Sequence, residues 1–308
     1  MARKRRGNPV HGWVILDKPL GMSSTRAVGA VRRLFEAQKA GHGGTLDPLA
    51  TGVLPIALGE ATKTVPFAME GRKAYRFAIR WGERRSTDDS EGAVVATADR
   101  RPSRAEIEAA LPGFTGEIRQ RPPEYSALHV GGERAYDRAR RGESVVLAPR
   151  TVRIDSLRLL AIPDLDHAEF EAEVGKGTYI RALGRDLAEA LGTLGHVSTL
   201  RRVRVGPFTE ARAISLENLA SLGHSPGPFG HLLPLETALD DIPALALTEA
   251  EATRLRCGQT VLPLRPSDRA LILELGEGQR IRATCGEKLV ALAEIAAGAL
   301  RPVRVMNL

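Results

Sequence analysis

One acidic residue, Asp47, lies in a stretch from Gln38 to Gly52 that holds four glycines and shows no helical or strand period. Irregular segments of this length inside a compact domain are usually functional or disordered. A carboxylate can act as a nucleophile or stabilise a developing positive charge. However, an aspartate that precedes a proline, here Pro48, is also a common turn former, and spacing alone favours that interpretation.

The glycine-rich segments do not match the motifs that bind nucleotides. The pair Gly41 and Gly43 lacks a third glycine at Leu46, so it is no dinucleotide fingerprint. The run from Gly175 to Thr178 lacks the upstream glycine of a phosphate-binding loop and the Ser or Thr directly after its lysine. His42 and Asp47 are close in sequence, but no cluster of His, Cys and carboxylates has metal-ligand spacing. The sequence therefore predicts neither a nucleotide cofactor nor a metal.

Hydrophobic periodicity and capping residues predict the elements that must position Asp47. Strands are expected at Trp13–Asp17, Val53–Leu58, Tyr75–Trp81, Val152–Leu160 and Ala168–Val174. Helices are expected after a cap at Ser23 or Ser24, after the capping box of Ser103 and Glu106, and from Thr178 to a stop at Gly192. Strand and helix signals interleave, and several strands look antiparallel, which favours an α+β fold over a doubly wound sheet.

Glycines and prolines interrupt the segment from Leu222 to Leu247, which we interpret as a domain boundary. The chain is accordingly divided into a basic tail (1–11), a catalytic domain (12–240) and a small C-terminal domain (246–308). In the last part, Thr248 caps a short helix. Brief strands at Ala270–Leu275, Arg280–Thr284 and Val303–Met306 fit a small barrel.

The chain of 308 residues carries a net charge of +7 and has a pI near 9.8. This balance favours a polyanionic partner, although arginine-rich composition alone can also produce it. The cysteines, Cys257 and Cys285, lack a C-x-x-C spacing, which fits a reducing cytoplasm. The longest apolar stretch, Leu289 to Leu300, falls short of the roughly 20 residues that a membrane span needs. We expect a cytoplasmic protein without a membrane segment.

The full run from Lys39 to Pro55 closely resembles the active-site signature of the TruB family of tRNA pseudouridine synthases. Further motifs agree in order and spacing: Leu16–Gly21, Gly59–Lys63, Lys73–Tyr75, Pro122–Leu128, Lys176–Arg181 and Leu200–Arg202. The resemblance is dense from Gly12 to Phe208. It implies a pseudouridine synthase fold with a mixed, largely antiparallel sheet flanked by helices. The tail resembles, more loosely, the PUA-like RNA-binding β-barrel of bacterial members.

The resemblance also implies roles for individual residues. Asp47 corresponds to the essential carboxylate, whether it attacks the sugar or the base or assists proton removal. Arg181 corresponds to the arginine that pairs with it, although spacing alone describes a solvated helix arginine. Tyr75 corresponds to the tyrosine that stacks on the target base, and otherwise would be a core strand residue. His42 corresponds to the histidine that fills the space left by the flipped base.

Four further residues are expected to contact substrate or RNA by the same resemblance, namely Lys18, Lys63, Tyr179 and Leu200. The chain departs from the family at His129, where a lysine is usual, so no RNA contact is carried over to that position. Ser23-Ser24 replaces the usual Thr-Ser and keeps a hydroxyl. Four arginines that follow His129 are candidates for phosphate contacts or for a solvated helix face, namely Arg134, Arg138, Arg140 and Arg141.

These features predict a cofactor-free, monomeric isomerase that converts uridine 55 in the T arm of tRNA to pseudouridine. The position of the uridine follows from the resemblance. Two alternatives stay open: a guide-RNA-dependent synthase of the archaeal and eukaryotic type, which requires protein partners, and an RNA chaperone that folds tRNA without chemistry. Activity of the purified chain without partners would argue against the guide-RNA-dependent synthase. The presence of both Asp47 and Arg181 argues against the chaperone.

Overall fold

The computed structural model describes residues 7–126, 128–130, 132–134, 136, 138, 141, 143, 147–223, 227–263 and 265–308. The candidate phosphate contact Arg140 and the first six residues of the predicted basic tail lie outside this part, as does Ala127 of the Pro122–Leu128 motif.

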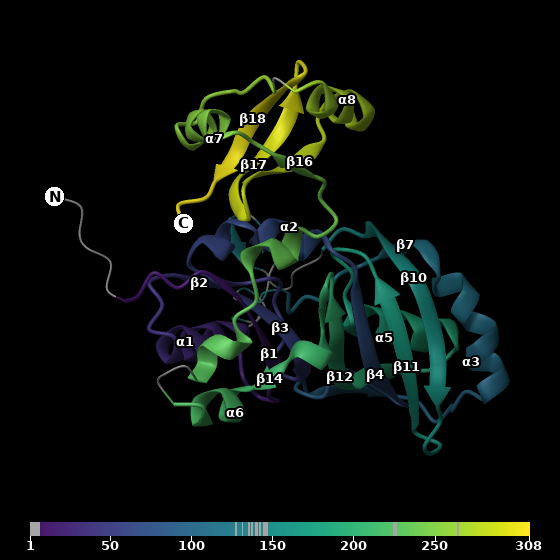
Figure 1. The fold of residues 1–308 in the computed structure, drawn as a ribbon. Coiled ribbons are helices and arrows are strands. Elements are labelled where there is room, and N and C mark those ends of the chain that lie inside the picture. The colour runs from purple at the N-terminus through teal and green to yellow at the C-terminus, as the bar shows by residue number, and fades with distance from the viewer. Residues whose placement is uncertain are drawn as a thin grey trace.

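The described residues form a ten-stranded mixed sheet at the centre of the larger body (Figure 1). Its order is β14 (Ile214–Ser215), β1 (Gly12–Lys18), β3 (Ala50–Leu58), β12 (Gly195–Val205), β4 (Lys73–Trp81), β11 (His167–Val174), β10 (Arg150–Ala161) and β7 (Gly116–Gln120), with β2 (Ala40–His42) on β3 and β13 (Phe208–Thr209) on β12. β1 pairs with β14 and β12 pairs with β3 in parallel, and the other pairs are antiparallel. The α+β prediction, with a mixed and largely antiparallel sheet, is confirmed.

The strands follow the local sequence pattern. In β11 the small and apolar residues from Ala168 to Val174 are buried at every second position, while the glutamates between them face the more exposed side. β3 begins at Ala50, three residues earlier than predicted, and β2 lies inside the stretch that the sequence describes as irregular. The loop that carries Asp47 is therefore the short connection between two paired strands.

Helices cover the sheet, and two of them bear on the site. α1 (Ser24–Leu34) is capped by Ser23, whose hydroxyl accepts a hydrogen bond from the Arg26 amide. α5 (Ile180–Ala190) packs on β12 and begins two residues later than predicted, with Tyr179 as its N-cap. Further helices among the described residues are α2 (Val65–Glu70), α3 (Arg104–Ala110), α6 (Leu216–Ser221), α7 (Glu249–Arg256) and α8 (Pro266–Leu275).

Short elements complete the chain. The small hairpin strands are β5 (Glu83–Arg85), β6 (Val94–Thr97), β8 (His129–Val130) and β9 (Glu133–Arg134). The 3-10 turns are η1 (Gly59–Lys63), η2 (Leu111–Phe114), η3 (Glu210–Arg212), η4 (Gly227–His231) and η5 (Leu235–Leu239). The segment interpreted as a linker contacts the larger body, because Leu233 exchanges two backbone hydrogen bonds of 2.8 Å with Trp13.

The C-terminal residues form a sheet in the order β15 (Ala244–Ala246), β16 (Arg280–Cys285), β17 (Lys288–Ala296) and β18 (Ala299–Val305). Within the described part of the chain this sheet is open, so the predicted closed barrel is not confirmed. The predicted strand at Ala270–Leu275 is wrong, because these residues belong to α8. Pro266 in its first turn favours a helix, and the helix buries Ile272.

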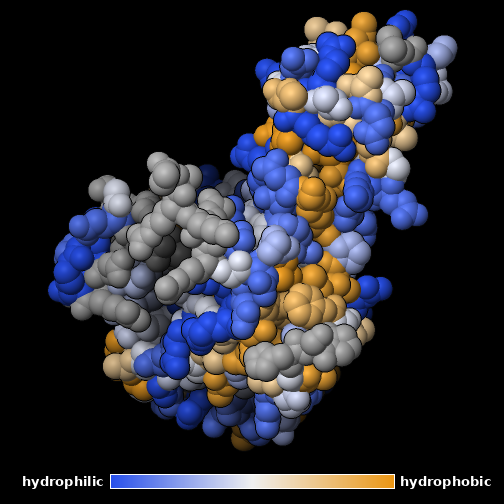
Figure 2. All heavy atoms as spheres, turned by 60° about the vertical axis from the view of Figure 1, so that its left-hand side comes forward, coloured by the Kyte–Doolittle hydropathy of each residue, from blue (hydrophilic) through white to orange (hydrophobic). Residues whose placement is uncertain are grey.

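The C-terminal sheet rests on α2 and η1 of the larger body (Figure 1). Leu289, Leu292 and Met306 belong to the same buried cluster as Trp13 and Phe208. Figure 2 shows apolar residues, in orange, running from the C-terminal domain down onto the body. The two parts thus share a hydrophobic core.

Candidate active site

Asp47 lies in the loop between β2 and β3, and its neighbours in the loop are held from several sides. The Ser24 hydroxyl, at the start of α1, accepts a hydrogen bond of 2.8 Å from the Leu46 amide and donates one of 2.9 Å to the Leu46 carbonyl. The Ala50 amide donates to the Asp47 carbonyl at 3.0 Å. Asp47 therefore does form a turn, as its spacing suggested, but the Asp47 side chain remains available for other contacts.

Lys18, at the end of β1, also binds the loop that carries Asp47. Its ammonium is buried and donates to the carbonyls of Pro19, Met22 and Pro48, at 2.9, 2.7 and 3.3 Å. Three carbonyls match the three hydrogens of a charged ammonium. Burial lowers the pKa of Lys18 to about 8, and the nearby Asp47 carboxylate opposes this shift. These contacts describe a residue that supports the loop.

Arg202 of β12 braces the start of the loop. Its buried guanidinium donates to the carbonyls of Gly44 at 3.0 Å, Thr45 at 3.4 Å and Val53 at 2.8 Å. Gly52, the third residue of β3, has a φ of +95° and lies so close to Arg202 that any Cβ would overlap its carbonyl oxygen. Sequence reasoning quoted Arg202 within a motif but gave it no role.

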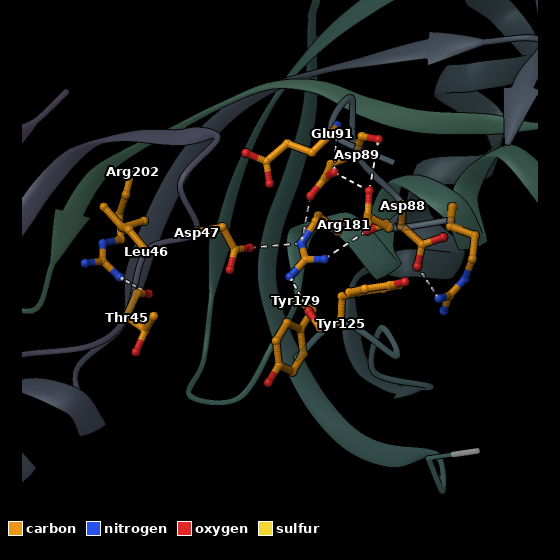
Figure 3. A network of polar contacts seen from close by, with 12 residues as sticks. Thr45, Leu46, Asp47, Asp88, Asp89, Glu91, Tyr125, Tyr179, Arg181 and Arg202 are labelled. Atoms are coloured by element: carbon orange, nitrogen blue, oxygen red, sulfur yellow. Dashed lines mark hydrogen bonds and ion pairs between the residues drawn. The ribbon is translucent and has the colours of Figure 1, made fainter. Parts of the chain in front are cut away.

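Arg181, in the first turn of α5, brings the predicted partners together (Figure 3). Its Nε lies 2.9 Å from Asp47 Oδ2, and its side chain is only 5% exposed. Its two Nη atoms each donate at 2.9 Å to backbone carbonyls, those of Thr87 and Tyr125. All three nitrogens of this guanidinium thus have partners, and its charge stabilises the Asp47 carboxylate.

A second carboxylate, Asp89, also faces Arg181, with Oδ2 at 3.5 Å from Nε. Asp89 is buried and accepts hydrogen bonds from the Thr87 hydroxyl and, at 3.0 Å, from the Glu91 amide. Sequence reasoning missed this residue. The adjacent acids Asp88 and Asp89 after a short strand were the available signal, but two acids in a turn are ordinary on a protein surface.

Three other predicted residues lie on the strands β12, β4 and β2. Leu200 of β12 is the register partner of Ala50, and Tyr75 of β4 is the partner of Arg202. Both side chains are mostly buried in the main core. His42 ends β2, and burial, followed by the nearby Arg202, lowers its pKa. A neutral imidazole at this position suits packing or stacking better than binding of phosphate.

Two predicted residues lie outside this group. Tyr179 is fixed by Gln120, which accepts from its amide at 2.9 Å and donates to its carbonyl at 3.1 Å, and its ring lies under the Arg150 guanidinium. The Lys63 ammonium contacts Glu60 at 2.6 Å and the carbonyl of Val305 in the C-terminal sheet at 2.7 Å. Within the described residues, Asp47 and Arg181 form the one hydrogen bond between side chains of the predicted set.

The arrangement offers a carboxylate, fixed on a braced loop, next to a buried cation. It suits a reaction in which positive charge develops near the carboxylate or a bond forms to it. In the ranges that the structure describes, no group of three His, Cys, Asp or Glu side chains is placed to hold a metal ion. None of the described helices is long and apolar enough to cross a membrane.

Comparisons with known proteins agree on one family. The family model described as TruB family pseudouridylate synthase (N terminal domain) matches residues 32–180, and the model described as tRNA pseudouridylate synthase B C-terminal domain matches residues 181–240. A Caulobacter sp. (strain K31) protein named tRNA pseudouridine synthase B is 55% identical, with 100% of both chains covered. A Rhodospirillum rubrum protein of the same name is 52% identical, again over 100% of both chains.

Solved structures show the same fold. A chain in the crystal structure of a Cbf5-Nop10-Gar1 complex is 27% identical and has a TM-score of 0.70, with 92% of this chain and 78% of that chain covered. A chain in an H/ACA RNP bound to a substrate RNA containing 2′-deoxyuridine has a TM-score of 0.73 at 23% identity, over 100% of this chain and 92% of that chain. With these relatives and its braced aspartate, the chain belongs to the TruB family of pseudouridylate synthases.

Proposed function

We propose that the protein isomerises uridine 55 in the T arm of tRNA to pseudouridine, as a cytoplasmic monomer without a cofactor, and that Asp47 is the essential carboxylate. The observation that carries this proposal is the contact of Asp47 with the buried Arg181 in a full-length relative of enzymes named tRNA pseudouridine synthase B. The basic charge of the chain suits a polyanionic RNA substrate.

The chemistry requires the bond from ribose C1′ to uracil N1 to break, the base to turn, and C1′ to join C5. The proton of C5 is lost and N1 gains one, so no atoms or electrons are exchanged with a second reactant. A carboxylate beside C1′ can bond to it or stabilise positive charge on the sugar. Arg181 lies on one oxygen of Asp47 and leaves the other without a protein hydrogen bond among the described residues.

The uridine must leave the RNA stack before Asp47 can reach it. We assign Tyr75 and Leu200 to the walls that receive the base, because they lie on β4 and β12, the two strands that follow β3 in the sheet. We assign His42, which ends the strand before the loop, to the space that the base vacates. Lys63, Lys18 and Tyr179 contact parts of the protein itself, which suits roles in holding the site and the C-terminal sheet.

The test incubates the purified protein with an unmodified tRNA transcript and maps pseudouridine by carbodiimide-dependent primer stops. We expect a stop at position 55 and none in a transcript with cytidine there. Asp47→Asn keeps the size of the side chain but removes its charge, so turnover should fall by about a thousandfold or more. An unmodified transcript after incubation with the wild-type protein would exclude the reaction by this chain alone, and full turnover by Asp47→Asn would exclude Asp47 as the essential carboxylate.

The same assay distinguishes an enzyme that acts alone from one that depends on a guide RNA and partner proteins. The structural relatives named above are complexes, of which one includes Nop10 and Gar1 and another is an H/ACA RNP with bound RNA. If this chain depended on such partners, the purified protein would leave the transcript unmodified. The higher identity to proteins named tRNA pseudouridine synthase B favours activity of the chain alone.

A further inference from the structure

A second buried ion pair lies directly behind the Asp47–Arg181 contact. Arg185 follows Arg181 by one helical turn on α5, and its Nη1 lies 2.7 Å from Asp88 Oδ2. The two side chains are 11% and 10% exposed. We infer that Asp88 and Arg185 are positioning residues, which fix the turn of residues 85–92 so that Asp89 and the Thr87 carbonyl meet Arg181 in the reactive arrangement.

Arg185 duplicates the connections that Arg181 makes. Arg181 donates to the Thr87 carbonyl in the turn and to the Tyr125 carbonyl beyond β7. Arg185 donates to the Asp88 carboxylate in the same turn and, at 2.8 Å, to the Arg121 carbonyl beyond β7. Two guanidinium groups on one face of α5 therefore tie the same two segments to the helix, one at the site and one behind it.

The backbone of the turn needs this support. Asp88 has a φ of +59°, in the left-handed region that residues with a Cβ rarely adopt. Such strain persists only where the surroundings enforce it. Backbone contacts supply part of the restraint, since the Asp88 amide donates to Arg85 and the Val197 amide donates to the Asp88 carbonyl, both at 3.1 Å. The Arg185 side chain supplies the restraint from the helix.

Burial makes the pair interdependent. Burial raises the pKa of Asp88, and the charges of Arg185, Arg181 and Arg84 oppose this shift. If Arg185 were removed, a carboxylate would stay buried without its nearest cation and would tend to become neutral. The pair also forms part of the wall of a cavity of about 760 Å³, whose lining also includes Arg119 and Glu124. The surrounding space lets the turn relax once the pair is broken.

The inference rests on the proposed function, and a double-mutant cycle on the full chain tests it. Asn tolerates the left-handed region, so Asp88→Asn removes the charge with little added strain. We expect Asp88→Asn and Arg185→Met each to lower kcat on saturating tRNA by about tenfold or more, while KM changes by less than about twofold. The double variant should be no slower than the worse single variant, because the two side chains act as a unit.

A matched control and a readout without activity complete the test. Glu189→Gln makes the same chemical change on α5 in an exposed pair with Arg84, and it should keep wild-type kcat. Amide exchange at Val197 and across residues 85–92 should accelerate in both single variants but not in Glu189→Gln. Wild-type kcat in Asp88→Asn, or lost kcat with unchanged exchange, would overturn the inference. An inactive wild-type protein would instead defeat the proposed function, and the exchange experiment would still decide whether the pair holds the turn.

Discussion

Arg181 is the residue on which the site converges, because it links one carboxylate on the loop, one carboxylate in the 85–92 turn and two backbone carbonyls. A lysine has one compact charge and cannot reproduce the planar fork of the guanidinium. We expect Arg181→Lys to lower kcat by about a hundredfold, since the charge stays but the orientation of Asp47 is lost. Single-turnover rates on saturating tRNA measure this loss.

Arg158→Lys is the matched control, because Arg158 lies on β10 and its exposed guanidinium pairs with Glu171. Its single-turnover rate should equal that of the wild type. Equal rates for Arg181→Lys and the wild type would show that charge alone suffices at position 181.

Lys18 gives the site a dependence of stability on pH. Its pKa is about 8 in the folded protein, against an ordinary value of 10.5 for lysine. Below pH 8 both states are charged, and between about pH 8 and 10.5 the unfolded chain binds the extra proton, so the stability due to this group rises with pH. The free energy of unfolding of the wild type minus that of Lys18→Met should rise over this window by up to about 3 kcal/mol. Lys73, whose pKa is also lowered to about 8, remains in both proteins and cancels.

Chemical denaturation of both proteins from pH 7 to 10.5 provides the measurement. A difference that stays flat or falls with pH would mean that Lys18 is not desolvated in solution.

At the residue scale, sequence motifs predicted a contact that the structure contains, while the chemical role of Asp47 stays a prediction. The family signature identified Asp47, and a second motif identified Arg181, which the fold brings to 2.9 Å. Asp89 was not predicted as a site residue, because its position depends on the pairing of the 85–92 turn with β12 and not on its local sequence. The role of Arg202 was not predicted, because it consists of contacts with backbone carbonyls far away in the chain.

At the scale of elements, local patterns predicted the strands and caps well and failed where a short apolar run fits both states. Ala270–Leu275 has only six residues, too few for a period to distinguish strand from helix. The signals that decide it lie upstream, in Pro266 and Asp268 of the first helical turn. β17 was not predicted as a strand, because a central strand that is buried along most of its length lacks alternation of apolar and polar residues.

The junction of the loop with β3 depends on a glycine. Gly52 combines positive φ with close approach to the Arg202 carbonyl, so Gly52→Ala must move β3 away from β12. We expect a loss of about 3 kcal/mol or more in unfolding free energy, measured by denaturant titration. Gly116→Ala separates strain from contact, because Gly116 has a similar φ of +92° but nothing within 4 Å of an added Cβ.

Gly116→Ala should cost only about 1 kcal/mol. Similar losses in the two variants would show that the backbone angle, and not the contact with Arg202, makes Gly52 necessary.

At the scale of the whole molecule, the C-terminal sheet is attached to the body by both polar and apolar contacts. Lys63 reaches the Val305 carbonyl, Glu60 accepts at 2.7 Å from the Asn307 amide, and the Arg280 guanidinium lies 4.9 Å from the centre of the Phe67 ring. These contacts connect the sheet to η1 and α2, the elements that directly follow the strand after the Asp47 loop. The site and the C-terminal sheet therefore lie at opposite ends of β3, which connects them.

A chain that ends at Leu247 tests what this attachment contributes. Removing residues 248–308 takes Leu289, Leu292 and Met306 out of the cluster that buries Trp13, so the midpoint of thermal unfolding should fall by several degrees. If the sheet binds RNA, the affinity for whole tRNA should fall by about tenfold, because several phosphate contacts are lost. The loop and Arg181 stay, so kcat on a saturating T-arm hairpin should remain within about threefold of the wild type. A truncated protein that is folded by circular dichroism but inactive on the hairpin would mean that the sheet helps to build the site through β3. Unchanged affinity for whole tRNA would place the RNA-binding surface entirely on the larger body.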